Sequence, residues 1–394
     1  MLDGLDDIRW DALEHAYGPA GDVPARLRGL LDPAADARRR ALSGLYGGIC
    51  HQGTRFEASA PAVPFLLELL QDPATPDRAA IARLVADLAV GSHETWLPGG
   101  FPAASLRADA AGGAELLRAA PPPAEDDEDE DFEGESRLDY LDGLDDAQQR
   151  ALAAYVELAA YDAVRAGLPV LRRLLADDDA AVRATAAYTL AWFPEDEPGA
   201  GTAALTGAAA DPSRSVAATA LVALGLLGTA VPAALHDPKP EIRWAAAIGL
   251  ARVHGPDAGP DAAARLLEWA GSPGTVRSGV PFLGGDLAGY AALTLPGLGD
   301  AYTAAALDAL LTRLGTVTGV QTLPVLATAL RIVFPDGARP AGAPLGPAQR
   351  RLATVLAGAP AAWQLDGRRF GNVTGLLSAY GLPADPTELG ALAG

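Results

Sequence analysis

Apolar residues recur along the chain at the three- and four-residue spacing of a helix face, in short segments separated by turn residues. Two leucine-rich segments, 64–70 and 169–175, show this pattern over two turns of helix. A longer segment, 146–164, has an apolar face that consists of Leu152, Tyr155, Val156, Leu158 and Ala159. Beyond Gly271 the pattern loosens, and it predicts further helices before and after a Pro/Gly-rich connection at 334–347, the earlier ones at 286–295, 301–314 and 322–333.

Five segments repeat one arrangement, in which an aspartate follows a short helix and precedes an alanine-rich apolar run. In four of them an arginine stands six residues after the aspartate, in the pairs Asp32 and Arg38, Asp72 and Arg78, Asp177 and Arg183, and Asp237 and Arg243. The fifth begins at Asp211 and has Ala217 at the arginine position. Aspartate and proline suit a tight turn before a helix, where a carboxylate accepts free backbone N–H groups. The repetition predicts a row of helical hairpins, each burying its apolar face against the next.

The best copies of this arrangement, 177–187 and 237–246, resemble HEAT repeats, particularly the bacterial form related to phycobilin-lyase HEAT-like repeats. The resemblance implies an all-α fold, a right-handed α-solenoid of HEAT-like helical hairpins, in which arginines stack against the aspartates from one repeat to the next. Residues 46–66 and 190–195 are similar to a family of bacterial HEAT-repeat proteins. An unrelated α-helical bundle with accidental spacing is the alternative.

The irregular spacing of the repeats divides the chain into four segments. HEAT-like repeats are expected over 1–117 and 138–272, and degenerate repeats with a cap over 273–394. The segment 118–137 is acidic: nine of the eleven residues from 125 to 135 are Asp or Glu. Such a run repels itself, so we expect a disordered, solvated spacer. Mimicry of nucleic acid and docking to a basic partner are the alternatives.

Residues 216–235 carry no charged side chain over twenty positions, which is the minimum length of a bilayer span. They are rich in Ala, Gly and Thr, and glycine and proline at 228–232 interrupt the run. We therefore expect a buried helix–turn–helix and no membrane span.

A helical wheel at about 100° per residue separates core from surface in the second helix of each hairpin. Each repeat has a position that corresponds to Val182. The residues two and six positions after it are predicted to face away from the core: Arg39, Ser43, Ala79, Arg83, Ala184, Tyr188, Ala218, Val222, Trp244 and Ile248. Trp192 flanks the same face. The resemblance implies that this helix lines a concave surface, and a strip of exposed aromatic side chains is typical of a binding surface. The predicted groove residues are Arg83, Tyr188, Trp192, Val222, Trp244 and Ile248. The alternative is that these rings pack under a neighbouring loop.

A second candidate site is the segment 46–57, in which glycines permit unusual backbone angles. We hypothesise that its polar side chains converge on a ligand or partner: Tyr46, His51, Gln52, Thr54, Arg55 and Glu57. The alternative is structural, in that the segment caps a helix and ties repeats together, with Arg55 and Glu57 paired.

The net charge of −20 over 394 residues argues against duplex nucleic acid as a partner, because phosphate neutralisation needs clustered Lys and Arg, and Lys239 is the sole lysine. The single cysteine, Cys50, excludes an internal disulfide and a cysteine-built zinc site. We expect Cys50 to be a buried, inert thiol, with a reactive thiol as the alternative. The first residues lack the basic and apolar regions of a secretory signal, so a cytoplasmic location is expected.

The sequence contains no phosphate-binding loop, nucleophile elbow or zinc-helix motif, and we expect no catalytic residue, no metal and no cofactor. The predicted function is a protein- or peptide-binding scaffold that uses a concave face, with an immunity protein or a pathway scaffold as specific versions. The competing class is an enzyme or small-molecule-binding protein on a HEAT-like fold, by analogy with phycobilin lyases and HEAT-like DNA alkyl-base glycosylases. The oligomeric state is left open.

Overall fold

The computed structural model describes residues 1–123, 136–195, 199–273, 277–340 and 342–394. These residues form twenty α-helices, short 3₁₀ turns and two antiparallel β-hairpins. The hairpins pair β1 (Glu14–His15) with β2 (Gly18–Pro19), and β3 (Gln364–Leu365) with β4 (Arg368–Arg369). The predicted all-α class is confirmed. The acidic run predicted to be a disordered spacer falls on residues 124–135, which lie outside the described residues.

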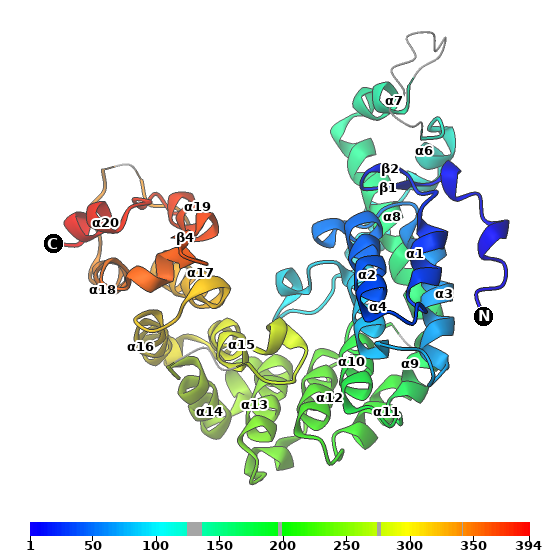
Figure 1. Ribbon diagram of the computed structural model, residues 1–394. Coiled ribbons are helices and arrows are strands. Elements are labelled where there is room, and N and C mark those ends of the chain that lie inside the picture. Colours follow the sequence, from blue (N-terminus) through cyan, green and yellow to red (C-terminus); the bar gives the residue numbers. More distant parts are fainter. Residues whose placement is uncertain (124–135, 196–198, 274–276, 341) are drawn as a thin grey trace. The chain divides into compact units, whose positions relative to one another are not determined.

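The chain divides into two compact units, labelled by element in Figure 1. Unit 1 comprises Met1–Trp96 and Gly100–Leu205, and unit 2 comprises Leu97–Gly99 and Thr206–Gly394. The four-segment division expected from the sequence stays a prediction.

Unit 1 is built from helical hairpins, in which α1 packs on α2, α3 on α4, and α9 on α10. The second helices lie in a row, because α4 contacts both α2 and α10. The long helix predicted at 146–164 is confirmed as α8, which packs against α3, α4, α5 and α6. The bounds are α1 (Val23–Gly29), α2 (Ala35–Ile49), α3 (Ser59–Gln71), α4 (Arg78–Val90), α5 (Ala103–Asp109), α6 (Gly113–Ala119), α7 (Arg137–Gly143), α8 (Asp146–Ala166), α9 (Leu168–Leu174) and α10 (Ala180–Leu190), with α11 (Ala200–Ala208) at the boundary of the units.

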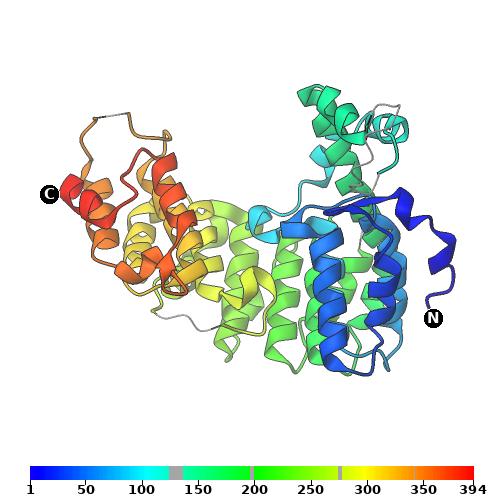
Figure 2. The same ribbon diagram turned by 45° about the horizontal axis from the view of Figure 1, so that its top comes forward.

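The helices of unit 2, coloured from yellow-green to red in Figure 2, form two rows by their contacts. Contacts link α13, α15, α17 and α19 along one row, and α14, α16, α18 and α20 along the other. The helices predicted at 286–295, 301–314 and 322–333 are confirmed as α15, α16 and α17. The bounds are α12 (Arg214–Leu226), α13 (Pro240–His254), α14 (Pro260–Ala270), α15 (Leu287–Thr294), α16 (Thr303–Leu314), α17 (Thr322–Val333), α18 (Pro347–Ala357), α19 (Gly371–Ala379) and α20 (Pro386–Ala393).

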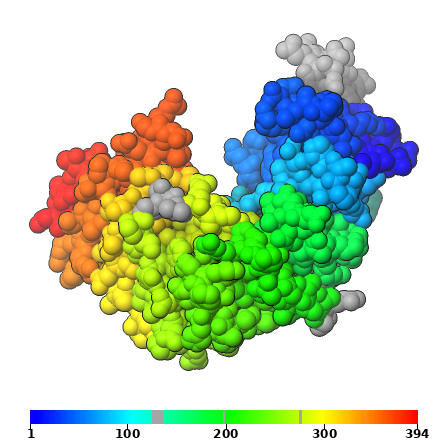
Figure 3. All heavy atoms as spheres, turned by 60° about the horizontal axis from the view of Figure 1, so that its bottom comes forward, coloured from blue at the N-terminus to red at the C-terminus, as the bar shows by residue number. Residues whose placement is uncertain are grey.

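Small residues allow the repeat helices of unit 2 to approach closely. A Cβ atom on Gly225 would lie 2.6 Å from the Cα of Gly249, so α12 and α13 meet there backbone to backbone. On the face that Figure 3 shows, the atoms of the yellow-green segment of this unit pack closely at the surface. In the run 216–235, α12 is followed by a 3₁₀ turn, Pro232–His236. Among the described residues, no helix has both the length and the apolar content that a bilayer span requires.

The five repeat aspartates make the same local contact. Each accepts, through Oδ1, the backbone N–H two residues later, over distances of 2.7–2.9 Å, at Asp32, Asp72, Asp177, Asp211 and Asp237. A short polar side chain that bonds its own backbone two residues on fixes a turn just ahead of a helix. The five segments read from the sequence are therefore structural repeats.

The repeat arginines bind within and between repeats. Arg38 and Arg183 donate to the carbonyl oxygens of the aspartates six residues earlier, at 2.9 and 2.7 Å. In unit 1, Nε of Arg38 also lies 2.7 Å from Oδ2 of Asp77, and Arg78 pairs with Asp177. The pairing that the resemblance implied, of an arginine with the aspartate of the next repeat, is thus present at Arg78 and Asp177, whereas Arg38 pairs with Asp77 and not with the repeat aspartate Asp72.

Candidate functional site

The aromatic strip predicted to be exposed is buried. Tyr188, Trp192 and Trp244 have no exposed surface. Val222 is likewise fully buried and Ile248 is 2% exposed. The prediction that these residues line an open groove is therefore wrong, and the alternative, in which the rings pack under a neighbouring loop, describes their surroundings.

In unit 1 the cover comes from the residues after α4. A 3₁₀ turn, His93–Trp96, places the His93 ring 5.5 Å from the Tyr188 ring and 6.4 Å from the Trp192 ring. Phe101 stacks on Tyr161 with the ring centroids 5.0 Å apart. Aromatic pairs at these separations gain energy beyond their buried area.

In unit 2 the cover comes from α15 itself, and the connection that leads into α15 packs on this helix. Phe282 is fully buried, with its ring 5.8 Å from the Tyr290 ring, which in turn lies 5.8 Å from the Trp244 ring. The indole N–H of Trp244 donates to the carbonyl oxygen of Leu287 at 2.9 Å. A buried indole whose N–H has a partner is a stable core element, so Trp244 belongs to the core of this unit.

Two predicted site residues, Tyr46 and Arg83, do come together, through an aspartate that the sequence analysis did not single out. Arg83 Nε lies 3.0 Å from both carboxylate oxygens of Asp87, and the Tyr46 hydroxyl donates to Asp87 Oδ2 at 3.1 Å. The Arg83 guanidinium also lies 4.9 Å from the centre of the Tyr188 ring. The four-residue separation of Arg83 and Asp87 on one helix was the signal available in the sequence.

His93 completes this cluster, which we call the Arg83 network: Tyr46, Arg83, Asp87 and His93. Nη2 of Arg83 lies 3.0 Å from Nδ1 of His93, and because arginine only donates, Nδ1 is the acceptor. The imidazole proton is then on Nε2, which lies 3.3 Å from Oε1 of Glu94. Burial and the Arg83 charge lower the pKa of His93 to about 3, so the ring is neutral near pH 7.

Burial also shifts the pKa values of two other groups in this region. It raises the pKa of Asp87 from its ordinary value, against the opposing charge of Arg83. It raises the pKa of the Cys50 thiol to about 12, and the charge of Asp87 adds to this shift. A nucleophilic cysteine requires a lowered pKa, so the expectation of a buried, inert thiol agrees with the structure.

The segment 46–57 uses its charged residues to hold unit 1 together. Nη2 of Arg55, whose side chain is 4% exposed, lies 2.7 Å from Oε2 of Glu157 on α8. Glu57 pairs with Arg137 at the start of α7. The predicted pairing of Arg55 with Glu57 is wrong, although the idea that the segment ties elements together is supported. Arg55 and Glu57 are anchors of the fold.

The exposed part of the candidate site lies on α2 and the turn between β1 and β2. Tyr17 is 68% exposed, and its hydroxyl lies 3.4 Å from Nδ1 of His51. We call this surface the α2 face: Tyr17, Arg39, Arg40, Ser43, Gly47 and His51. An open depression of about 650 Å³ is lined by Tyr17, Arg39, Arg40, Ser43 and Gly47 together with Arg26, Asp36 and Gly44. The predicted residues Gln52 and Thr54 follow His51 and are exposed.

The α2 face combines an aromatic ring with guanidinium groups. Arg39 pairs with Asp36, and within the described ranges no ion pair involves Arg40. Tyrosine and arginine are enriched in protein interfaces and dominate their binding energy. Sequence reasoning predicted the outward orientation of Arg39 and Ser43, which are exposed, but missed Tyr17 and Arg40. An aromatic residue in the Gly-Pro turn at 16–19 and the arginine run at 38–40 were the available signals.

Comparison with known proteins supports the repeat assignment in unit 2. The family described as HEAT repeats matches residues 201–280, which contain α12, α13 and α14. The crystal structure of an engineered protein is 17% identical, with coverage of 95% of this chain and 97% of that chain and a TM-score of 0.26. No curated protein matches the chain. Residues 201–280 are thus similar to HEAT repeats, and the narrower likeness to the phycobilin-lyase form stays a prediction.

Proposed function

We propose that this chain is a protein-binding scaffold built on HEAT-like repeats and that the α2 face is its contact surface. HEAT repeats generally mediate protein–protein interactions, which gives the class of function. The observation that carries the proposal is the exposure of Tyr17, at 68%, beside an open depression lined by Arg39 and Arg40. An immunity protein and a pathway scaffold are specific versions of this function.

The chemistry of the α2 face supports binding. A large ring held in water is ready to bury apolar area in an interface, at about 25 cal/mol per Å². The Arg40 guanidinium adds a planar set of donors that matches carboxylates and backbone carbonyls. The Arg83 network beneath this region has a neutral His93 and a protonated Cys50 nearby, which suits a rigid support more than acid–base or thiolate chemistry.

Co-purification followed by mass spectrometry tests the class of function. The proposal expects a polypeptide retained in a fixed stoichiometry. Retention of a small molecule, with no polypeptide, would favour the competing class of enzyme or small-molecule binder.

Titration of the retained polypeptide against variants of this chain tests whether the α2 face is the contact surface. Tyr17→Ala and Arg40→Glu should each weaken binding by about tenfold or more, as expected for interface anchors. Val320→Ala is the control, because Val320 is 46% exposed and lies in unit 2. Equal affinity for the wild type and both α2-face variants would remove this surface from the proposal.

A further inference from the structure

Helix α4 begins one turn later than its counterparts. Four repeat helices begin three residues after the repeat aspartate, in the pairs Asp32 and Ala35, Asp177 and Ala180, Asp211 and Arg214, and Asp237 and Pro240. Helix α4 begins at Arg78, six residues after Asp72. Three residues are close to one turn of an α-helix, so the first turn is missing from α4.

The sequence before α4 explains the missing turn. Thr75 precedes Pro76, and a residue before proline is pushed out of the helical region. Asp77 has a φ of 53°, in the left-handed region, which a right-handed helix does not admit. The first repeat has Ala35, Asp36 and Ala37 at the equivalent positions and is helical there.

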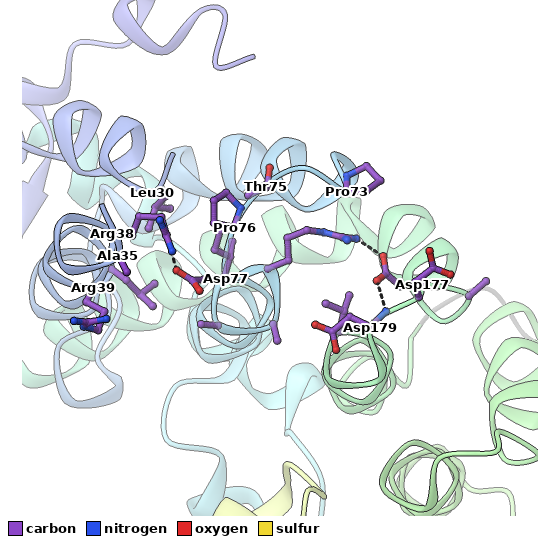
Figure 4. Close-up of a pocket in the computed structure, with 18 residues that line it drawn as sticks. Leu30, Ala35, Arg38, Arg39, Pro73, Thr75, Pro76, Asp77, Asp177 and Asp179 are labelled. Carbon is purple, nitrogen blue, oxygen red and sulfur yellow. Dashed lines mark hydrogen bonds and ion pairs between the residues drawn. The ribbon is translucent and has the colours of Figure 1, made fainter. Parts of the chain in front are cut away.

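The missing turn leaves a pocket of about 930 Å³ in unit 1, between the beginnings of α2 and α10 (Figure 4). Apolar side chains form much of its lining: Leu30, Leu42, Pro76, Ala79, Ile81 and Val182. Thr75, which is 5% exposed, also lines the pocket, and its hydroxyl has no hydrogen-bond partner among the described residues. Because that hydroxyl oxygen is itself buried, the pocket offers a ligand mainly its apolar lining, which suits an apolar group.

The charged side chains at the pocket differ in how accessible they are to a ligand. The side chains of Arg38 and Arg78 are only 15% and 10% exposed, and they are held by Asp77 and Asp177. Figure 4 shows Arg38 directed toward Asp77, and Arg39, which also lines the pocket, pairs with Asp36. Asp178 and Asp179, by contrast, are exposed where the pocket meets α10. The charge offered to a ligand is therefore negative, in a chain whose net charge is −20.

We propose that this pocket binds an apolar side chain of a partner polypeptide, next to a basic residue of the partner that pairs with Asp178 or Asp179. The inference rests on the proposed protein-binding function and adds a second contact point with its own chemistry. The partner segment that fits carries leucine or phenylalanine flanked by arginine or lysine. Long-range attraction between the acidic chain and a basic partner speeds their association.

Fluorescence anisotropy with short labelled peptides tests the proposal on the full chain. One peptide has a central phenylalanine flanked by arginines, a second has glutamates in place of the arginines, and a third has serine in place of the phenylalanine. The first peptide should bind about tenfold more tightly than either of the others. Equal binding of the three peptides, or no binding of the first, would overturn the proposal.

Two variants locate the binding. Ala79→Phe fills the pocket and should weaken binding of the arginine peptide about tenfold, whereas Ala74→Phe, at an exposed position outside the pocket lining, should leave it unchanged. Unchanged binding by Ala79→Phe, with its helical circular dichroism retained, would also overturn the proposal.

Asp178→Lys tests the charge preference without touching the core. This exposed substitution should reduce the difference in affinity between the arginine and glutamate peptides. An unchanged difference would contradict the role assigned to Asp178 and Asp179. The peptide tests can fail while Tyr17→Ala and Arg40→Glu still weaken binding of the retained polypeptide. That result would reject the pocket proposal but not the proposal that the α2 face is a contact surface.

Discussion

At the scale of single residues, burial controls which groups carry charge in unit 1. Arg83 keeps its charge because Asp87 faces it, and the charge of Arg83 in turn opposes protonation of His93. His93 is 2% exposed, so a proton on its ring would also lose most of its hydration. The imidazole serves as a neutral acceptor between two helices, which makes the fold of unit 1 sensitive to acid.

The pKa of about 3 for His93 predicts a loss of stability at low pH. The ordinary histidine pKa is about 6.5, so between these values the unfolded chain holds a proton at this site that the folded chain does not. The free energy of unfolding should therefore fall by about 2 kcal/mol from this residue alone between pH 7.5 and pH 5, and continue to fall toward pH 3. Urea unfolding at pH 7.5 and pH 5 measures the difference.

His93→Gln should remove this part of the pH dependence, because Asp87 and Tyr46 are present in both proteins. His254→Gln, the same change at an exposed position at the end of α13, is the control and should keep the wild-type loss. An identical pH dependence in the wild type and His93→Gln would show that the ring is not held neutral by the fold.

At the scale of elements, connections between helices decide which helix faces meet solvent. The wheel placed Arg39 and Ser43 outward on α2 correctly, because nothing covers that part of the helix. The same helical wheel predicted that Tyr188 on α10 and Trp244 on α13 face solvent, and both are buried. The covering residues, His93 and Tyr290, belong to segments distant in sequence, and a periodicity of 3.6 residues carries no information about them.

The connection that leads into α15 is held by a buried ion pair. Nη2 of Arg313 on α16 lies 3.0 Å from Oδ1 of Asp286, and the two side chains are 2% and 5% exposed. Asp286 Oδ1 also accepts the backbone N–H of Gly289 at 2.9 Å, which caps α15. Burial raises the pKa of Asp286 from its ordinary value, although the Arg313 charge opposes this shift. Removal of either partner leaves a buried charge without its counterion.

Asp286→Ala should destabilise unit 2 by about 3–5 kcal/mol, as is usual when one partner of a buried pair is lost. Asp308→Ala is the matched control on α16, since Asp308 and Arg351 form an exposed pair and such pairs contribute about 0–1 kcal/mol. Urea unfolding followed by the fluorescence of the buried indoles measures both. Equal effects of the two substitutions would contradict the role assigned to the buried pair.

At the scale of the whole molecule, the repeats were predictable because local chemistry defines them. An aspartate that bonds its own backbone at Asp32 or Asp237 needs no distant partner, so spacing alone revealed the row of hairpins. Helix bounds at α8 and α17 followed from apolar periodicity for the same reason.

The candidate site was predictable only in part, because its parts meet through tertiary contacts. Tyr46 and Arg83 were predicted on different grounds, and both bind Asp87. Arg55 and Glu57 were predicted to pair with each other, but Arg55 binds Glu157 and Glu57 binds Arg137. The exposure of Tyr17 follows from a two-residue β-hairpin that periodicity does not reveal.

Hydrogen–deuterium exchange of the chain, alone and with its retained polypeptide, tests the central claim most directly. The claim is that the predicted groove residues on α10, α12 and α13 are buried in the free protein and that the partner contacts the α2 face. We expect slow exchange in the free protein at residues 184–190 of α10 and at α12 and α13, unchanged by the partner. New protection should appear at the β1–β2 turn, α2 and residues 46–57, and at the pocket residues 73–81 and 176–182. Fast exchange at residues 184–190 of α10 or at α13 in the free protein, or new protection at those residues on binding, would contradict the account.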